Sequence, residues 1–137
     1  ADLIDSFIKT VEGNGAELCG EDNWNIHRVE NGILSNEEYN RGFLPGELGL
    51  DEIVDLKKGC YPGQEIHARL ESRGKLSKKI MRFRTDSKLD VGTYISNTGR
   101  KVRVTSSLGN QGFAVISVKE NNELKLNDEL LILTEEL

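Results

Sequence analysis

Residues after Gly74 alternate with a period of two, which is the pattern of half-buried β-strands and the strongest constraint on the fold. The alternating runs cover residues 78–85, 93–96, 101–106, 112–118 and 129–133. Asparagine, aspartate and glycine residues, which favour turns, separate these runs. About five or six short strands at this spacing predict a small antiparallel barrel or sandwich.

The first part of the chain has helical periodicity instead. Apolar residues within positions 3–12 share one face of an expected amphipathic helix, which Gly13-Asn14-Gly15 ends. A second, shorter helix is expected from Asn23, as its N-cap, to a stop at Asn31-Gly32. Helices in the first part and strands in the second make the chain α+β.

Residues 34–54 have weak periodicity and predict a long, mostly irregular connection. A third helix is expected over about residues 62–72, because Pro62 suits the first helical position and Glu65 suits the first turn. Long connections in compact proteins often wrap a functional site. We therefore expect residues 34–54 to lie near such a site.

The composition excludes several classes of protein. The net charge is −5 and the basic residues form no long block, so nucleic acid is not an expected partner. The sequence contains no apolar run of about 20 residues and begins with no leader pattern, so we expect a cytoplasmic protein without a membrane partner. In a chain of this size, two reduced thiols are expected in place of a Cys19–Cys60 disulfide.

Cys60 lies just before the expected third helix and follows Lys57 and Lys58. Unpaired backbone N–H groups at a helix start favour an anion, so cysteines in this setting are often reactive thiolates. Cys60 is therefore a candidate nucleophile, redox-sensitive thiol or metal ligand, and a buried, inert cysteine is the alternative. The gap from Cys60 to His67 is longer than usual zinc spacings, so no metal site is predicted.

Arg28 and Glu30 lie on the expected second helix and could line a cleft with arginines of the third, since arginine forks suit carboxylates. Solvated surface charges are the alternative. The two histidines and the missing G-x-S-x-G motif give no basis for a hydrolase triad. The sequence contains no G-x-x-x-x-G-K-[ST] run, so a nucleotide-binding loop is not predicted.

The run Lys57-Lys58-Gly59-Cys60-Tyr61-Pro62-Gly63-Gln64-Glu65 closely resembles the K-G-C-Y-x-G-Q-E signature of YgfZ-type proteins. Upstream, residues 27–32 resemble the L-R-x-E-x-G segment shared with GcvT, the aminomethyltransferase of glycine cleavage. Downstream, residues 99–106 and 112–114 resemble the pattern of that superfamily's C-terminal barrel. The resemblance to YgfZ/GcvT-type folate-binding proteins therefore covers nearly the whole chain.

The resemblance implies how this α+β chain is divided. Residues 1–74 would be the end of a ferredoxin-like α/β folate-binding domain, and residues 75–137 would be a small antiparallel β-barrel. The boundary is expected near Arg73-Gly74-Lys75. An N-terminal portion or subunit would complete the folate channel.

The resemblance also implies a ligand and a site. Cys60 would be the reactive cysteine of the YgfZ branch. Tetrahydrofolate would contact five side chains: Arg28, Glu30, Lys58, Tyr61 and Gln64. The implied function is that of a folate-binding accessory protein of iron–sulfur cluster assembly or repair, which binds more than it turns over and serves iron–sulfur client enzymes. The alternative is aminomethyltransferase-like transfer of a one-carbon unit to tetrahydrofolate.

Overall fold

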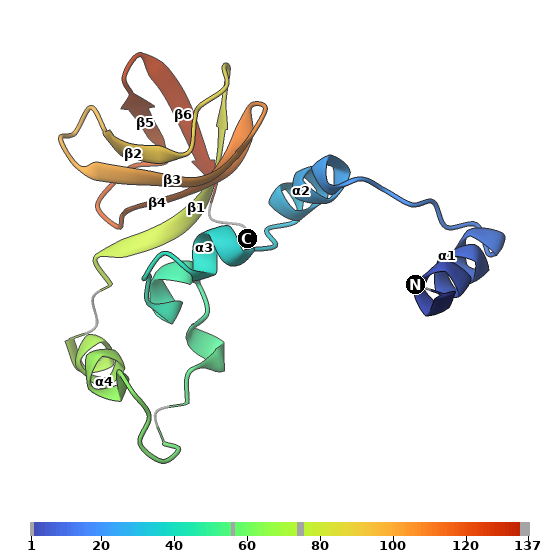
Figure 1. Ribbon diagram of the computed structural model, residues 1–137. Helices are drawn as coiled ribbons and strands as arrows, with labels where there is room; N and C mark the ends of the chain where they lie inside the picture. The colour runs from blue at the N-terminus through green and yellow to red at the C-terminus, as the bar shows by residue number, and fades with distance from the viewer. Residues whose placement is uncertain (1, 56, 74–75, 135–137) are drawn as a thin grey trace.

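The computed structural model describes residues 2–55, 57–73 and 76–134, and it has helices in its first part and strands in its second (Figure 1). The α+β class and the barrel-like second part are confirmed. The helices are α1 (Asp2–Gly13), α2 (Glu21–Glu30), α3 (Asn36–Tyr39), η1 (Pro45–Leu48), η2 (Asp51–Ile53) and α4 (Gln64–Arg73). The strands are β1 (Lys78–Thr85), β2 (Gly92–Ile95), β3 (Lys101–Leu108), β4 (Gln111–Ser117), β5 (Glu123–Leu126) and β6 (Glu129–Thr134).

The six strands form one antiparallel sheet in the order β2-β3-β4-β1-β6-β5. The sheet curls so that its two edges approach each other, and an isolated bridge between Ser96 and Leu126 joins them (Figure 1). A curled sheet of this kind protects most of its edge hydrogen-bonding groups from unwanted pairing. The second part of the chain is therefore a small, partly closed barrel.

The interior of the barrel holds the larger of two apolar clusters. Every strand except β2 contributes fully buried or nearly buried side chains to it, and Tyr94 of β2 packs against it. The buried members are Met81, Phe83, Leu89, Val102, Val104, Ala114, Ile116, Leu124, Leu126, Leu131 and Leu133. Burial of this many apolar side chains supplies the main favourable term for folding of the barrel.

The second apolar cluster lies on the outer face of the barrel. Ile80 of β1 and Phe113 and Val115 of β4 are buried there against Val29 of α2 and Leu48 of η1. These strands are thus apolar on both faces, unlike a sheet with one solvated face. The helical segment from α2 to η1 is in this way fixed to the barrel by packing.

A β-bulge in β3 places Ser106 on this outer face. The register of β3 with β4 shifts between Val104 and Ser106, so that Ser106 lies opposite Phe113. A bulge inserts one extra residue and re-aims the side chains that follow it. A Cβ atom on Gly112 would lie 2.0 Å from the Ser106 carbonyl oxygen. Glycine is therefore required where β4 passes the bulge.

The helices α1 and α4 contrast with α2. Figure 1 shows both of them apart from the barrel, with α1 joined to α2 by an extended segment. None of the residues Asp2–Gly13, all of which the structure describes, is buried. The large apolar side chains of Leu3, Ile4 and Phe7 are 86%, 66% and 66% exposed. The amphipathic stripe predicted for this helix is present, but its apolar side faces outward.

Several boundaries differ from the predictions. Helix α2 begins at Glu21 with Gly20 as N-cap, so the prediction of Asn23 as N-cap was wrong. Helix α4 begins at Gln64, because Pro62 and Gly63 form a turn in which Gly63 has a φ of 86°. The φ value is one that glycine adopts readily, and it delays the helix by two residues relative to the expected start.

The connection over residues 34–54 is more ordered than expected, since it contains α3, η1 and η2. Strand β5 was not among the predicted runs, although its four residues alternate polar and apolar side chains and the structure buries its two leucines. The predicted boundary includes Gly74 and Lys75, which lie outside the described residues, and the division into two domains stays a prediction. Every helix among the described residues falls short of the length and apolar character that a membrane span needs.

Candidate functional site

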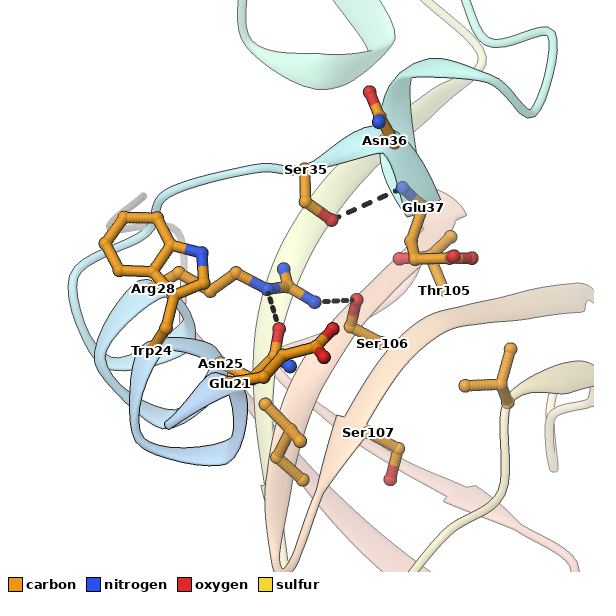
Figure 2. Close-up of a pocket in the computed structure, with 12 residues that line it drawn as sticks. Glu21, Trp24, Asn25, Arg28, Ser35, Asn36, Glu37, Thr105, Ser106 and Ser107 are labelled. Carbon is orange, nitrogen blue, oxygen red and sulfur yellow. Dashed lines mark hydrogen bonds between the residues drawn. The ribbon is translucent and has the colours of Figure 1, made fainter. Parts of the chain in front are cut away.

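A pocket of about 410 Å³ lies between α2, the start of α3 and the bulged strand β3 (Figure 2). Its wall is mostly polar, with a single aromatic side chain. The lining residues are Glu21, Trp24, Asn25, Arg28, Ser35, Asn36, Glu37, Val91, Thr105, Ser106, Ser107 and Leu108. Ligand pockets commonly have volumes of roughly 300–1,000 Å³, so this one is large enough for a small molecule.

Arg28 is at the back of this pocket and is only 4% exposed. Its Nε donates a hydrogen bond to Asn25 Oδ1 at 2.8 Å, and its Nη2 donates one to Ser106 Oγ at 2.8 Å (Figure 2). Its Nη1 lies 3.4 Å from Glu38 Oε2. A buried charge must be paired and hydrogen-bonded, and all three sides of this guanidinium meet a polar partner.

Glu38 balances this charge and is itself fully buried. Its Oε1 accepts a hydrogen bond from Ser106 Oγ at 2.6 Å, and its Oε2 accepts from Ser35 N at 2.9 Å and Ser35 Oγ at 3.1 Å. Ser35 and Glu38 form the capping box that begins α3. One carboxylate therefore caps α3, pairs with α2 and bonds to β3.

The segment around Cys60 is elsewhere in the molecule. Figure 1 shows the loop before α4 at the opposite end of the helical region from α2. Cys60 is exposed and its thiol is free, as is that of Cys19. The Lys58 ammonium lies 5.2 Å from the centre of the Tyr61 ring, and the Tyr61 and His67 rings are 6.3 Å apart.

No known protein-family profile matches this chain, but individual proteins do. A tRNA-modifying protein YgfZ of Aliivibrio fischeri is 36% identical over 74 residues, covering 48% of this chain and 21% of that protein. A mitochondrial iron–sulfur cluster assembly factor IBA57 homologue of Mycosarcoma maydis is 32% identical over 85 residues, covering 59% of this chain and 20% of that protein. A putative chloroplastic transferase of Arabidopsis thaliana is 32% identical over 106 residues, covering 76% of this chain and 24% of that protein. The chain resembles YgfZ/GcvT-type proteins.

The chain spans about half the length, or less, of the curated relatives it matches. An uncharacterized protein of Haemophilus influenzae aligns with 98% of this chain at 28% identity, and the chain covers 51% of that protein. These partial matches support the YgfZ/GcvT-type superfamily at low identity. The signature around Cys60 stays a prediction.

The structure separates the residues expected to contact a YgfZ-type ligand. Arg28 lines the pocket, whereas Glu30 is exposed at the end of α2, where its carbonyl oxygen accepts a hydrogen bond from Arg82 Nη1. Lys58, Tyr61 and Gln64 belong to the segment that begins α4 and are not among the residues lining this pocket. The expected site is therefore divided between the pocket and the Cys60 segment.

The helix start that was expected to favour a Cys60 thiolate is displaced. Because α4 begins at Gln64, the turn from Tyr61 to Gly63 separates Cys60 from the first helical residue. The electrostatic effect of a helix end falls off within about one turn. The exposed lysines, Lys57 and Lys58, are then the nearest positive charges along the chain.

Sequence reasoning did not find Glu38 and Ser106. The sequence Ser35-Asn36-Glu37-Glu38 does contain the S-x-x-E pattern of a capping box, which could have marked α3 and its acid. Ser106 lies inside a predicted strand, and only the bulge turns it outward. Period-2 reasoning places it on the inner face, so no local pattern could have paired it with Arg28.

Proposed function

We propose that this chain is part of a tetrahydrofolate-binding accessory protein of iron–sulfur cluster assembly or repair. The observation that carries the proposal is the similarity to relatives named YgfZ and IBA57, one of which is an iron–sulfur cluster assembly factor by name. The YgfZ relative is also named a tRNA-modifying protein. A protein that supports an iron–sulfur enzyme of tRNA modification would contribute to that process indirectly.

The Arg28 pocket suits a folate-type ligand in size and polarity. Ser107 Oγ lines it and is buried without a hydrogen-bond partner among the described residues. A buried polar atom of this kind costs free energy unless a ligand or water satisfies it. Trp24, Asn25 and Asn36 add an aromatic surface and two amides. When bound, the folate would supply a carrier for a one-carbon unit, and these residues would hold and orient it.

We propose that Cys60 provides the chemistry of this function as an exposed thiol beside Lys57 and Lys58. An exposed thiol can, in its thiolate form, attack an electrophile or bind iron transiently. Lys58, Tyr61 and Gln64 would then form the ligand contacts on this side, and Glu30 would act from the end of α2. These assignments rest on the resemblance to the K-G-C-Y-x-G-Q-E signature.

We also propose that an N-terminal portion, in the same protein or as a subunit, completes the site and brings its two parts together. The relatives extend well beyond the region matched by this chain. The exposed side chains of Leu3, Ile4 and Phe7 on α1 fit such a neighbour, because a helix of 12 residues is marginal in water without packing. The isolated chain would then bind tetrahydrofolate weakly.

The test replaces Cys60 in the longest form of the protein that contains this chain. We expect Cys60→Ser to abolish rescue of iron–sulfur client enzymes in cells lacking the protein, while folding measured by circular dichroism is unchanged. Cys19→Ser is the matched control, since Cys19 is also exposed and free. Full rescue by Cys60→Ser would rule out a chemical role for this thiol.

The second candidate is aminomethyltransferase-like transfer of a one-carbon unit to tetrahydrofolate. The name of the Arabidopsis thaliana relative, a putative transferase, favours it. Release of ammonia from an aminomethyl carrier that depends on tetrahydrofolate would support this candidate over the accessory role. Client rescue without any such turnover would support the accessory role.

A further inference from the structure

We infer that the Arg28 pocket takes a flat, uncharged, hydrogen-bonding ring against Trp24, and that Arg28 is not available to a ligand carboxylate. The inference rests on the proposed folate function and deepens it. For tetrahydrofolate, the reduced pterin ring would enter this pocket and the glutamate tail would lie outside it. This assignment is opposite to the expectation that an arginine in a cleft receives the carboxylates.

The charges around the pocket disfavour an anionic ligand. The positive charge of Arg28 is balanced by Glu38, which is fully buried 3.4 Å away. Glu37 at the pocket wall pairs with Arg41. Glu21 is a further carboxylate in the wall. The described lining residues therefore offer no unbalanced positive charge, and an anion entering the pocket would meet repulsion from Glu21.

The burial and existing hydrogen bonds of Arg28 keep its guanidinium from pairing with a ligand carboxylate. Its guanidinium is only 4% exposed and already donates to Asn25 and Ser106. A ligand carboxylate could form a bidentate pair only if it displaced these partners and left the Glu38 carboxylate buried without its counter-charge. Removing the partner of a buried charge typically costs about 3–5 kcal/mol, which one surface-accessible carboxylate would not offset.

The remaining wall suits a neutral ring. Trp24 lines the pocket and is 49% exposed, so its indole can pack against a planar heterocycle. Ser107 Oγ offers a buried hydroxyl that no described residue satisfies. Asn36 and Thr105 add further polar groups to the wall. A ring with several donors and acceptors at its edge, such as a reduced pterin, matches this combination.

Trp24 also provides the measurement, because it is the single tryptophan of the chain. The full chain is titrated with tetrahydropterin, tetrahydrofolate and p-aminobenzoylglutamate up to the solubility limit of each, so that the weak binding expected of this chain is measured, and binding is followed by calorimetry and Trp24 fluorescence. We expect tetrahydropterin and tetrahydrofolate to change the fluorescence with dissociation constants within about threefold of each other. The tail fragment p-aminobenzoylglutamate is expected to leave the fluorescence unchanged.

A variant pair tests whether the ring sits at the inferred place. Ser107→Ala is expected to weaken tetrahydropterin binding about threefold to tenfold, which corresponds to one lost hydrogen bond. Ser77→Ala is the matched control, since Ser77 is exposed and does not line the pocket. An equal affinity of the two variants would overturn the inference.

The outcomes separate the inference from the proposed function. Fluorescence changes with p-aminobenzoylglutamate but not with tetrahydropterin would overturn the inference and leave folate binding intact. If tetrahydrofolate does not bind but tetrahydropterin does, the proposed function fails and the inference about the pocket stands. If neither compound changes the fluorescence, both fail.

Discussion

The barrel and helix α1 both carry a regular apolar pattern, yet they bury it to opposite degrees. In the barrel, Phe83 and Leu131 are fully buried, whereas Leu3 and Phe7 of α1 are mostly exposed. The barrel finds its partners within the chain, because its strands close on one another and α2 covers part of the outer face. The difference is that the barrel buries its apolar side chains within the described part of the chain, whereas α1 leaves its own unburied.

The largest expected effect compares two phenylalanines, one in each region. Phe83→Ala is expected to lower the free energy of unfolding by about 4 kcal/mol, because it leaves a cavity in a fully packed interior. Phe7→Ala is expected to change it by less than about 0.5 kcal/mol, since Phe7 is 66% exposed. Urea denaturation followed by circular dichroism gives both values. Similar losses for the two variants would show that α1 is packed in solution.

The second test concerns the segment that joins the two regions. Glu38→Ala is expected to destabilise the protein by about 3 kcal/mol, because it leaves the Arg28 charge buried and unpaired. Glu37→Ala is the neighbouring control. Its pair with Arg41 is more exposed, and such pairs contribute about 0–1 kcal/mol. A small effect of Glu38→Ala would mean that α3 detaches from the barrel easily.

The third test compares two glycines. Gly112→Ala is expected to cost about 2 kcal/mol, because the added methyl would overlap the Ser106 carbonyl oxygen and the Phe83 ring. Gly13 ends α1 with open space around it, so Gly13→Ala is expected to be neutral or slightly stabilising. Thermal unfolding of both variants measures the difference. A neutral Gly112→Ala would contradict the tight fit at the bulge.

The smallest effect is expected from removing α1 altogether. A chain that begins at residue 20 is expected to unfold within about 0.5 kcal/mol of the full chain, because no described residue of α1 is buried. The same urea experiment applies. A larger loss would place α1 against the barrel or α2 and would remove the contrast between the regions.

The sequence was a good guide where one local period dominates. The strands at residues 78–85 and 112–118 and the helix at residues 3–12 were predicted within one or two residues, because alternation and amphipathic spacing persist through them. Strand β5 was missed although its four residues alternate polar and apolar side chains, so the signal for it was present in the sequence. The start of α2 was misplaced because Gly20 caps it without any side-chain hydrogen bond that the sequence could reveal.

The site was harder to predict than the fold. Arg28 was identified, but its buried partners Glu38 and Ser106 are 10 and 78 residues away in the chain. A pairing over such separations depends on how α2, α3 and β3 pack together, and no local pattern encodes it. The prediction that Cys60 lies next to a helix start failed for a local reason, namely the positive φ of Gly63. The roles of Cys60 and the other signature residues stay predictions.

Because of the bulge in β3, the pocket depends on the lengths of its strands as well as on its residue types. Inserting one residue between Phe113 and Ala114, opposite Thr105, would remove the bulge, restore regular alternation and turn the Ser106 hydroxyl toward the barrel interior. Glu38 would keep its place but lose its shortest donor, and an apolar interior would receive a hydroxyl. The numbers of residues in β3 and β4 therefore determine which face of the sheet Ser106 occupies. Variants that preserve the pocket must keep the number of residues along both strands as well as their chemistry.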